Sequence, residues 1–188
     1  MKTDIRQEWR TPKNLWDLMD ACYRFNFDLA ANSGNALCEA WVGPDNKAEW
    51  LRDIFSPLAG RVFAGEEPRT IRAYCNPGFS GFAQWLPRCR DLIRQFDAFD
   101  FIVVMALVDP STGWWAQWAM DADEIVFLRP RVQFVAPPGV RASSNTKPNC
   151  LLIYRPRPVN YYADPRFVNW DWKTAERYNE TQALLARP

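Results

Sequence analysis

Apolar residues near the start of the chain recur first with the period of a helix and then with that of a strand. The helical spacing runs through Leu15, Leu18, Met19, Cys22 and Phe25. Thr11 and Pro12 have the form of an N-cap followed by proline at the first helical position, which predicts a helix of about 13 residues. Residues 25–30 then alternate with period two and lead into a polar loop at 31–35. We expect a short strand there, with Asp28 at its C-terminal end.

The middle of the chain predicts a strand, a turn and a helix in succession. Residues 71–75 are a candidate strand, the Asn-Pro-Gly-Phe run at 76–79 has a turn signature, and Ser80 is placed to cap a helix. Pro87 is expected to kink that helix before it continues to Phe96. Residues 100–107, DFIVVMAL, are almost continuously apolar, as in a strand buried on both faces of a parallel sheet.

The remaining segments extend this alternation of helices and strands. Helices are predicted at 47–54, 113–120 and 174–186, and strands at 124–128, 132–135 and 150–154. Residues 56–70 are predicted to be a surface excursion, and 136–149 an irregular segment rich in proline, serine and asparagine. The pattern predicts an α/β sandwich with a mostly parallel sheet. The 188 residues fit one domain, 1–188, with an aromatic, proline-rich C-terminal extension from about residue 156.

The composition removes several classes of chemistry. The chain has no histidine, which excludes His-based zinc sites and catalysis by Ser-His-Asp or Cys-His groups. Its five cysteines show no C-x-x-C spacing, so we expect reduced thiols and no metal site. The first residues are polar, and the longest apolar run, 101–108, is far too short to span a bilayer. We therefore expect a protein of the cytoplasm that does not bind membranes.

The charge is distributed unevenly along the chain. The net charge is only +1, but six of the 23 basic residues fall between residues 125 and 163, where no acidic residue occurs. The rest of the chain has 17 basic and 22 acidic residues. The six basic residues are Arg129, Arg131, Arg141, Lys147, Arg155 and Arg157. Such a stretch is typical of a phosphate-binding surface, and equally of a solvated basic face.

The Asn76-Pro77-Gly78-Phe79 run also has two interpretations. As a bare tetrapeptide it is a β-turn, with proline at the second position and glycine tolerating the positive φ of a type II turn at the third. It also lies between a predicted strand and a predicted helix, at the strand end where open α/β sheets bind ligands. The loop is therefore a candidate active site.

Several motifs in a fixed order resemble those of the phage and prophage DNA N6-adenine methyltransferases. They are WRTPKNLWDLMD, FNFDLAAN, the carboxylates of DNKAEWLRD, YCNPGFS, DPSTGWWAQWA, EIVFLRPRVQFVAPPG and NTKPNCLLIY, which together span about residues 9–155. The resemblance implies a Rossmann-like methyltransferase fold, a three-layer sandwich, with S-adenosylmethionine as cofactor. It also implies double-stranded DNA as the partner and a flipped adenine as the methyl acceptor.

In this resemblance the NPGF loop carries the catalytic residues. The Asn76 amide oxygen and the Pro77 carbonyl are expected to accept hydrogen bonds from the adenine amine, and Phe79 to stack on the extruded base. Methyl transfer from a sulfonium needs an aligned acceptor rather than a metal or a histidine. The family pattern is usually NPPY or NPPF, and Gly78 replaces the second proline. A catalytically degenerate protein that binds cofactor, nucleic acid or a host factor is therefore the alternative, and modification of another base is a third possibility.

The same resemblance implies a set of cofactor-binding residues. Asp28 and Ala30 belong to the short DLAA element, in which the carboxylate is placed to accept from the methionine ammonium. An Asx cap at the strand end is the alternative for Asp28. Asp53, or Glu49 or Asp45, is expected at the ribose or adenine, and the alternative is a solvated helix face. Thr11 and Pro12 match a TP element over the cofactor, or simply begin a helix.

The last motifs bear on DNA and on the core. Arg131 and Phe134 match an R-x-x-F element, and the predicted DNA-binding residues are Arg129, Arg131, Arg141 and Lys147. Arg155 and Arg157 are expected to add positive charge beside the substrate loop. Trp114 and Trp115 match a WW element after the central strand, and we expect at least one of them to be a core residue. The recognition sequence and the oligomeric state are not predicted, since most protein–DNA contacts go to phosphates.

Overall fold

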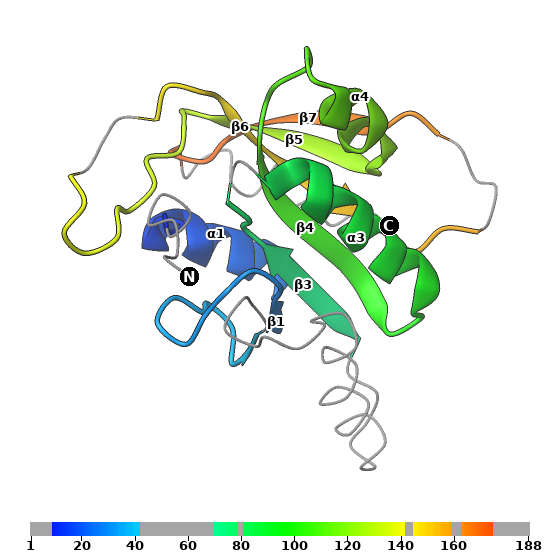
Figure 1. The fold of residues 1–188 in the computed structure, drawn as a ribbon, viewed down its shortest axis with the longest axis horizontal. Coiled ribbons are helices and arrows are strands. Elements are labelled where there is room, and N and C mark those ends of the chain that lie inside the picture. The colour runs from blue at the N-terminus through cyan, green and yellow to red at the C-terminus, as the bar shows by residue number, and fades with distance from the viewer. Residues whose placement is uncertain (1–8, 42–69, 79–80, 142–144, 159–162, 175–188) are drawn as a thin grey trace.

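The described part of the chain builds one seven-stranded sheet with helices packed against it (Figure 1). This is a computed structural model that describes residues 9–41, 70–78, 81–141, 145–158 and 163–174. The strands are β1 (Phe27–Asp28), β2 (Ala40–Trp41), β3 (Ile71–Cys75), β4 (Phe99–Leu107), β5 (Glu124–Arg129), β6 (Asn149–Tyr154) and β7 (Arg166–Asp171). The helices are α1 (Lys13–Tyr23), α3 (Phe82–Gln95), α4 (Gly113–Gln117) and the short 3₁₀ helix η3 (Ala119–Asp121).

The sheet is mostly parallel, as predicted. Its strand order is β2-β1-β3-β4-β6-β5-β7. The first four strands pair in parallel, β7 is parallel to β5, and β6 runs antiparallel to both β4 and β5. Leu107, the last residue of β4, faces Asn149, the first residue of β6. The residues before β6 therefore lie at the carboxyl edge of the sheet, and those after it at the amino edge.

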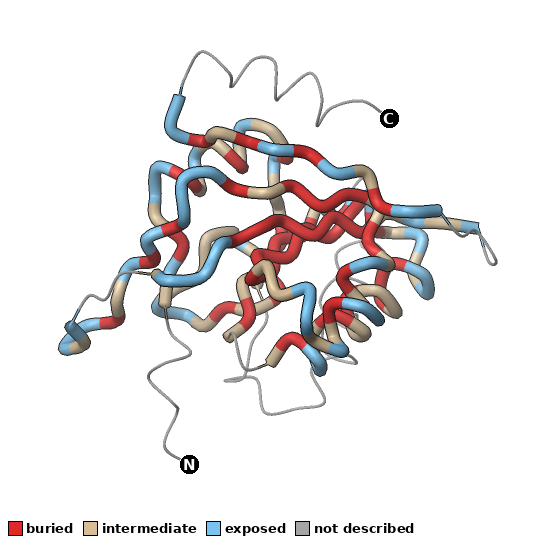
Figure 2. Tube along the Cα trace, turned by 90° about the horizontal axis from the view of Figure 1, so that it is seen from above, coloured by how far each residue is buried: buried red, intermediate tan, exposed pale blue. Residues whose placement is uncertain are grey.

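Buried clusters on both faces of the sheet make the three layers. Successive side chains of β4 point to opposite faces. Phe101, Val103 and Met105 pack with Leu15, Met19 and Tyr23 of α1. Ile102, Val104 and Ala106 pack with Leu86, Cys89, Leu92 and Ile93 of α3. Burial of each large apolar side chain contributes about 1.5–3 kcal/mol. Figure 2 shows that the central strands are buried along most of their length, and the two clusters place that burial on both faces, which confirms the Rossmann-like α/β sandwich.

Several element boundaries differ from the sequence prediction. The N-cap of α1 is Pro12 instead of Thr11, and the helix ends at Tyr23, where Arg24 adopts the left-handed conformation at φ 52°. The predicted strand at 25–30 is reduced to the two residues of β1. The N-cap of α3 is Gly81, and that helix runs through Pro87 to Gln95. The predicted features at 47–54 and 56–69, and residues 175–186 of the predicted last helix, lie outside the described residues.

Two predictions about strands were wrong. Residues 132–135 are not a strand: Val132 and Phe134 are buried, but the backbone pairing is an isolated bridge between Val135 and Arg10. The alternation of apolar and polar residues arises because Val132 and Phe134 pack into the core, although the backbone there does not pair with a neighbouring strand. Conversely, residues 166–171 form β7, within the segment predicted as an extension. Its buried Val168 and Trp170 alternate with more exposed residues, but the prolines and aromatics around it obscured the pattern. The assignment of residues 1–188 to one domain stays a prediction.

Candidate active site at the carboxyl edge of the sheet

The carboxyl ends of two neighbouring strands place an aspartate and an asparagine on the same edge of the sheet. Asp28 is the last residue of β1, and Asn76 directly follows β3. The two strands pair in parallel, with Asp28 opposite Tyr74. The N-terminal segment that leads into α1 crosses the same edge, since Trp9 and Thr11 contact Asn76. Ligands of open α/β sheets bind at this edge.

Asp28 is a buried carboxylate without a recorded cationic partner among the described residues. Its side chain accepts hydrogen bonds from the backbone N–H groups of Ala30, at 3.3 Å, and Leu37, at 3.2 Å. Burial raises the pKa of Asp28 to about 6, although the two N–H bonds oppose this shift. The bond to Ala30 is the Asx-cap interaction that the sequence analysis gave as the alternative role of Asp28. The buried charge also fits a ligand that brings an ammonium group, because such a group would supply the missing cation.

Asn76 is half-buried and its amide nitrogen faces the N-terminal segment. The Nδ2 atom donates to the Thr11 hydroxyl at 3.3 Å and to the Trp9 carbonyl at 3.4 Å. The Thr11 hydroxyl also lies 2.6 Å from the hydroxyl of Tyr74. Thr11 therefore does not cap α1, because its oxygen is engaged with the strand instead. Pro12 contributes its carbonyl to the first helical hydrogen bond, from the N–H of Trp16.

The other residues of the predicted loop are only partly described. Pro77 is buried directly after Asn76, and Phe79 lies outside the described residues, as does Asp53. After this loop, the N–H of Gly81 donates to the Gly78 carbonyl at 2.8 Å.

The four predicted DNA-binding residues all lie beyond the carboxyl edge. Arg129 ends β5 and pairs with Asp171 at 2.8 Å, with 73% of its own side chain exposed. Lys147 precedes β6 and pairs with Asp109 at 3.1 Å. This bond lowers the pKa of the Asp109 carboxyl. Arg131 and Arg141 are exposed on the segment that extends away from the sheet after β5 (Figure 1, yellow-green).

The prediction for Arg155 and Arg157 was wrong. Both follow β6, and because that strand is antiparallel they lie at the amino edge, across the sheet from Asn76. Arg155 pairs with Glu124 at 3.2 Å, and Arg157 pairs with Asp123 at 2.7 Å. Their acidic partners come from the start of β5 and the residue before it. These two arginines are held in ion pairs that stabilise the fold.

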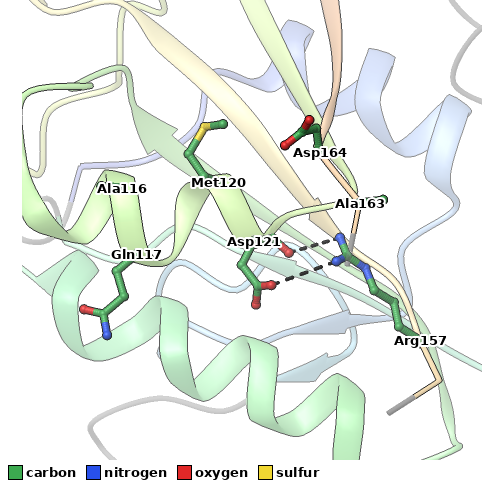
Figure 3. Close-up of a pocket in the computed structure, with 7 residues that line it drawn as sticks. All are labelled: Ala116, Gln117, Met120, Asp121, Arg157, Ala163 and Asp164. Atoms are coloured by element: carbon green, nitrogen blue, oxygen red, sulfur yellow. Dashed lines mark hydrogen bonds and ion pairs between the residues drawn. The ribbon is translucent and has the colours of Figure 1, made fainter. Parts of the chain in front are cut away.

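A pocket of about 460 Å³ also lies at this amino edge. Figure 3 shows Asp121 and Arg157 facing each other across it, joined by the interactions drawn as dashed lines. Asp121 is bound further by Arg94 at 2.9 Å. The residues that line the pocket are Ala116, Gln117, Met120, Asp121, Arg157, Ala163 and Asp164. None of the predicted catalytic, cofactor-binding or DNA-binding residues is among them, and the Asp121–Arg157 pair is already partnered, so the carboxyl edge is the candidate active site.

The aromatic motif residues are mostly core. Trp115 is 5% exposed and packs with the α3-side cluster, which confirms the expected core role for one of the two tryptophans. Trp114 is half-buried, and its ring centroid lies 4.8 Å from that of Phe82. Phe134 is buried on the α1 side.

A comparison with protein-family models gives a match to DNA N-6-adenine-methyltransferase (Dam) over residues 1–171. The chain belongs to the Dam family. The match confirms the resemblance drawn from the motifs, and it covers most of the chain. No curated protein and no solved structure matches the chain.

The site of this Dam-family chain contains one group that the sequence did not indicate. Tyr74 is fully buried within β3, and a tyrosine in an apolar strand predicts a core residue. Only the fold shows that its hydroxyl meets Thr11. Within the described residues, no cluster of three or more potential metal ligands occurs. Likewise, no described helix is long and apolar enough to cross a membrane.

Proposed function

We propose that this Dam-family chain transfers a methyl group from S-adenosylmethionine to the N6 amine of a flipped adenine in double-stranded DNA. The observation that carries the proposal is the placement of Asp28 and Asn76 at the carboxyl ends of two adjacent parallel strands. Asp28 offers a buried carboxylate that has no cationic partner among the described residues, and Asn76 offers an amide at the start of the proposed catalytic loop. A site of this kind provides one anchor for a cationic amino-acid group and one acceptor for a neutral amine.

Asp28 would bind the methionine ammonium of the cofactor. The carboxylate is preorganised because two backbone N–H groups already hold it. Ala30 and the N-terminal Thr11-Pro12 element border the same edge, and Asp53 remains a proposed ribose or adenine ligand from its sequence motif. When bound, S-adenosylmethionine supplies the methyl group as a sulfonium, which needs no metal to react.

Asn76 and Pro77 would hold the acceptor nitrogen. The Asn76 amide oxygen and the Pro77 carbonyl would accept hydrogen bonds from the two N–H groups of the adenine amine. These bonds would favour sp³ geometry at the nitrogen and free its lone pair to attack the methyl group. Transfer would form the N–C bond as the C–S bond of the sulfonium breaks, and the adenine nitrogen would release one proton to water. Phe79 would hold the extruded base by stacking, worth about 1–3 kcal/mol.

The basic residues beyond the carboxyl edge would contact the DNA backbone. Arg129, Arg131, Arg141 and Lys147 lie on the side of the sheet that carries Asn76, so phosphates bound there would bring the duplex to the site. We propose a site-specific enzyme that acts in the cytoplasm, the host's if the chain is phage-encoded.

The test is incubation with labelled S-adenosylmethionine and mixed-sequence duplex DNA, followed by nucleoside analysis. We expect N6-methyladenine from the parent. Loss of a hydrogen-bonding group used in the reacting complex costs about 100-fold or more, so Asn76→Ala should lose transfer while cofactor affinity stays within a few-fold. Asn169→Ala, at an exposed position of β7, is the matched control. Cofactor binding without transfer to any DNA would instead establish the binding-only alternative.

A further inference from the structure

An asparagine that must accept hydrogen bonds has to present its oxygen to the substrate. Rotation of the amide by half a turn exchanges its oxygen acceptor for an NH₂ donor. In that orientation the Asn76 side chain would point a donor at the adenine amine, which is itself a donor. The reaction proposed above therefore needs a contact that selects one orientation of the Asn76 amide.

The contacts of Asn76 provide that selection. Its Nδ2 atom lies 3.4 Å from the carbonyl oxygen of Trp9, which can only accept. The same nitrogen lies 3.3 Å from the Thr11 hydroxyl, a second available acceptor. With the nitrogen held toward the N-terminal segment, the oxygen points the other way. The structure records no hydrogen bond from a described residue to that oxygen.

Thr11 is itself fixed from two directions. Its hydroxyl lies 2.6 Å from that of Tyr74, and both side chains are buried. The Tyr74 ring cannot move freely, because Trp16 packs on it edge-to-face at 5.2 Å and Phe25 lies 5.4 Å away. On the other side, the backbone of Arg10 exchanges two hydrogen bonds with Val135, at 3.0 and 2.9 Å.

We infer that Thr11 and Tyr74 are positioning residues that fix the Asn76 amide with its oxygen toward the substrate amine. The inference rests on the proposed function, and assigns the N-terminal TP element a role besides that of covering the cofactor. A buried hydroxyl pair with a purely structural role would stabilise the fold without affecting the amide. The two roles make different predictions for catalysis and for the amide itself.

The experiment compares four full-length variants. Thr11→Val removes the acceptor at almost unchanged volume, Thr11→Ser keeps the hydroxyl, and Tyr74→Phe removes its partner. Tyr154→Phe is the matched control, since that buried hydroxyl donates to the Trp118 carbonyl on the opposite face of the sheet. Steady-state kinetics gives kcat and KM for DNA, and the Asn76 side-chain NH₂ resonances, assigned with Asn76→Ala, report hydrogen exchange.

Loss of one such hydrogen bond is worth about a threefold to tenfold change, so we expect kcat to fall by that factor in Thr11→Val, with KM nearly unchanged. Tyr74→Phe should show a smaller fall, Thr11→Ser should recover most of the rate, and Tyr154→Phe should lower stability without lowering kcat. The Asn76 NH₂ protons should exchange faster in Thr11→Val and not in Thr11→Ser.

Equal kcat in Thr11→Val and the parent, or Asn76 NH₂ exchange that Thr11→Val leaves unchanged, would overturn the inference. If the parent transfers no methyl group to any DNA, the proposed function fails and the NH₂ exchange alone decides whether Thr11 holds the amide. Faster exchange in Thr11→Val, absent in Thr11→Ser, would then support the held amide without the reaction.

Discussion

The backbone N–H of Leu37 donates to the carboxylate of Asp28 at 3.2 Å, across nine positions of the chain. Together with the Ala30 bond, this contact closes the loop after β1 around a buried acid. The carboxylate of Asp28 thus holds this loop together through two backbone hydrogen bonds, and it has no cationic partner among the described residues. Asp28 has a structural and a proposed binding role at the same time, and the two respond differently to pH.

The first prediction concerns cofactor binding and pH. Since burial places the pKa of Asp28 at about 6, the carboxylate is present above that pH and lost below it. Affinity for S-adenosylmethionine should therefore weaken as the pH falls through about 6, by up to about tenfold for each pH unit. Asp28→Ala should bind weakly at every pH, without this dependence. Calorimetry over a range from about pH 5 to about pH 8, which brackets the transition, measures both.

The control for this experiment is Asp100→Ala, at an exposed position near the start of β4. It should keep the affinity of the parent and its pH dependence. Equal cofactor affinities for the parent and Asp28→Ala would leave Asp28 with the loop-closing role alone. In the ligand-free protein the opposite sign applies: because the folded pKa lies above the ordinary 3.8, ionisation of Asp28 lowers stability as the pH rises between the two values.

The second prediction concerns the departure from the family pattern at Gly78. In a catalytic NPGF loop that follows the family pattern, residue 78 is expected to have a φ of about −65°, the value that proline fixes. Gly78→Pro should fold, and is expected to gain about 0.4–1 kcal/mol through the unfolded state. Gly139→Ala is the contrast, since φ of 81° should make that change destabilising. Thermal unfolding of both variants is the measurement, and a Gly78→Pro variant that fails to fold would contradict it.

The third prediction concerns the surface beyond the carboxyl edge. The double variant Arg141→Ala/Lys147→Ala should bind duplex DNA more weakly. The slope of log affinity against log salt should become shallower by about 0.9 for each phosphate that the protein no longer neutralises. Sequence preference should change little, since phosphate contacts carry no base information. Arg94→Ala, in the last turn of α3 at the other edge, is the control. A slope equal to that of the parent would place residues 141 and 147 away from the DNA.

The fourth prediction concerns the ion pairs at the amino edge. Glu124 is 5% exposed and is bound by Arg155 at 3.2 Å and Arg166 at 2.6 Å. Glu124→Gln should lower the free energy of unfolding by about 2 kcal/mol or more, since it leaves two arginines without this charge partner. Lys13→Ala, which breaks an exposed pair with Asp17, should cost about 0.5 kcal/mol or less. Urea unfolding measures both, and similar losses for the two would show that burial adds nothing to the Glu124 pairs.

The ion pairs of Glu124 with Arg155 and Arg166 also allow a test of which edge of the sheet contacts DNA. Because they lie away from Asn76, Glu124→Gln should leave the salt slope of DNA binding unchanged at temperatures where the variant is folded. A changed slope would show that DNA reaches the amino edge as well.

The sequence by itself determined the features that depend on residues close together in the chain, namely individual strands and short motifs. The apolar run at 100–107 predicted the central strand because burial on both faces leaves no polar alternation. The run at 71–75 predicted β3 and thereby placed Asn76 at a strand end. The order of short motifs predicted the family, since motif spacing is itself a property of the chain.

Only the tertiary structure decided which distant residues meet. Arg155 and Arg157 belong to the same acid-free stretch as Lys147, but the antiparallel direction of β6 sends them to the opposite edge, where acids at the start of β5 neutralise them. The meeting of Thr11, Tyr74 and Asn76 joins positions that are 63 and 65 residues apart along the chain. Strand direction and long-range hydrogen bonds depend on how all the strands and helices pack together, and the local pattern of hydrophobic residues does not encode them.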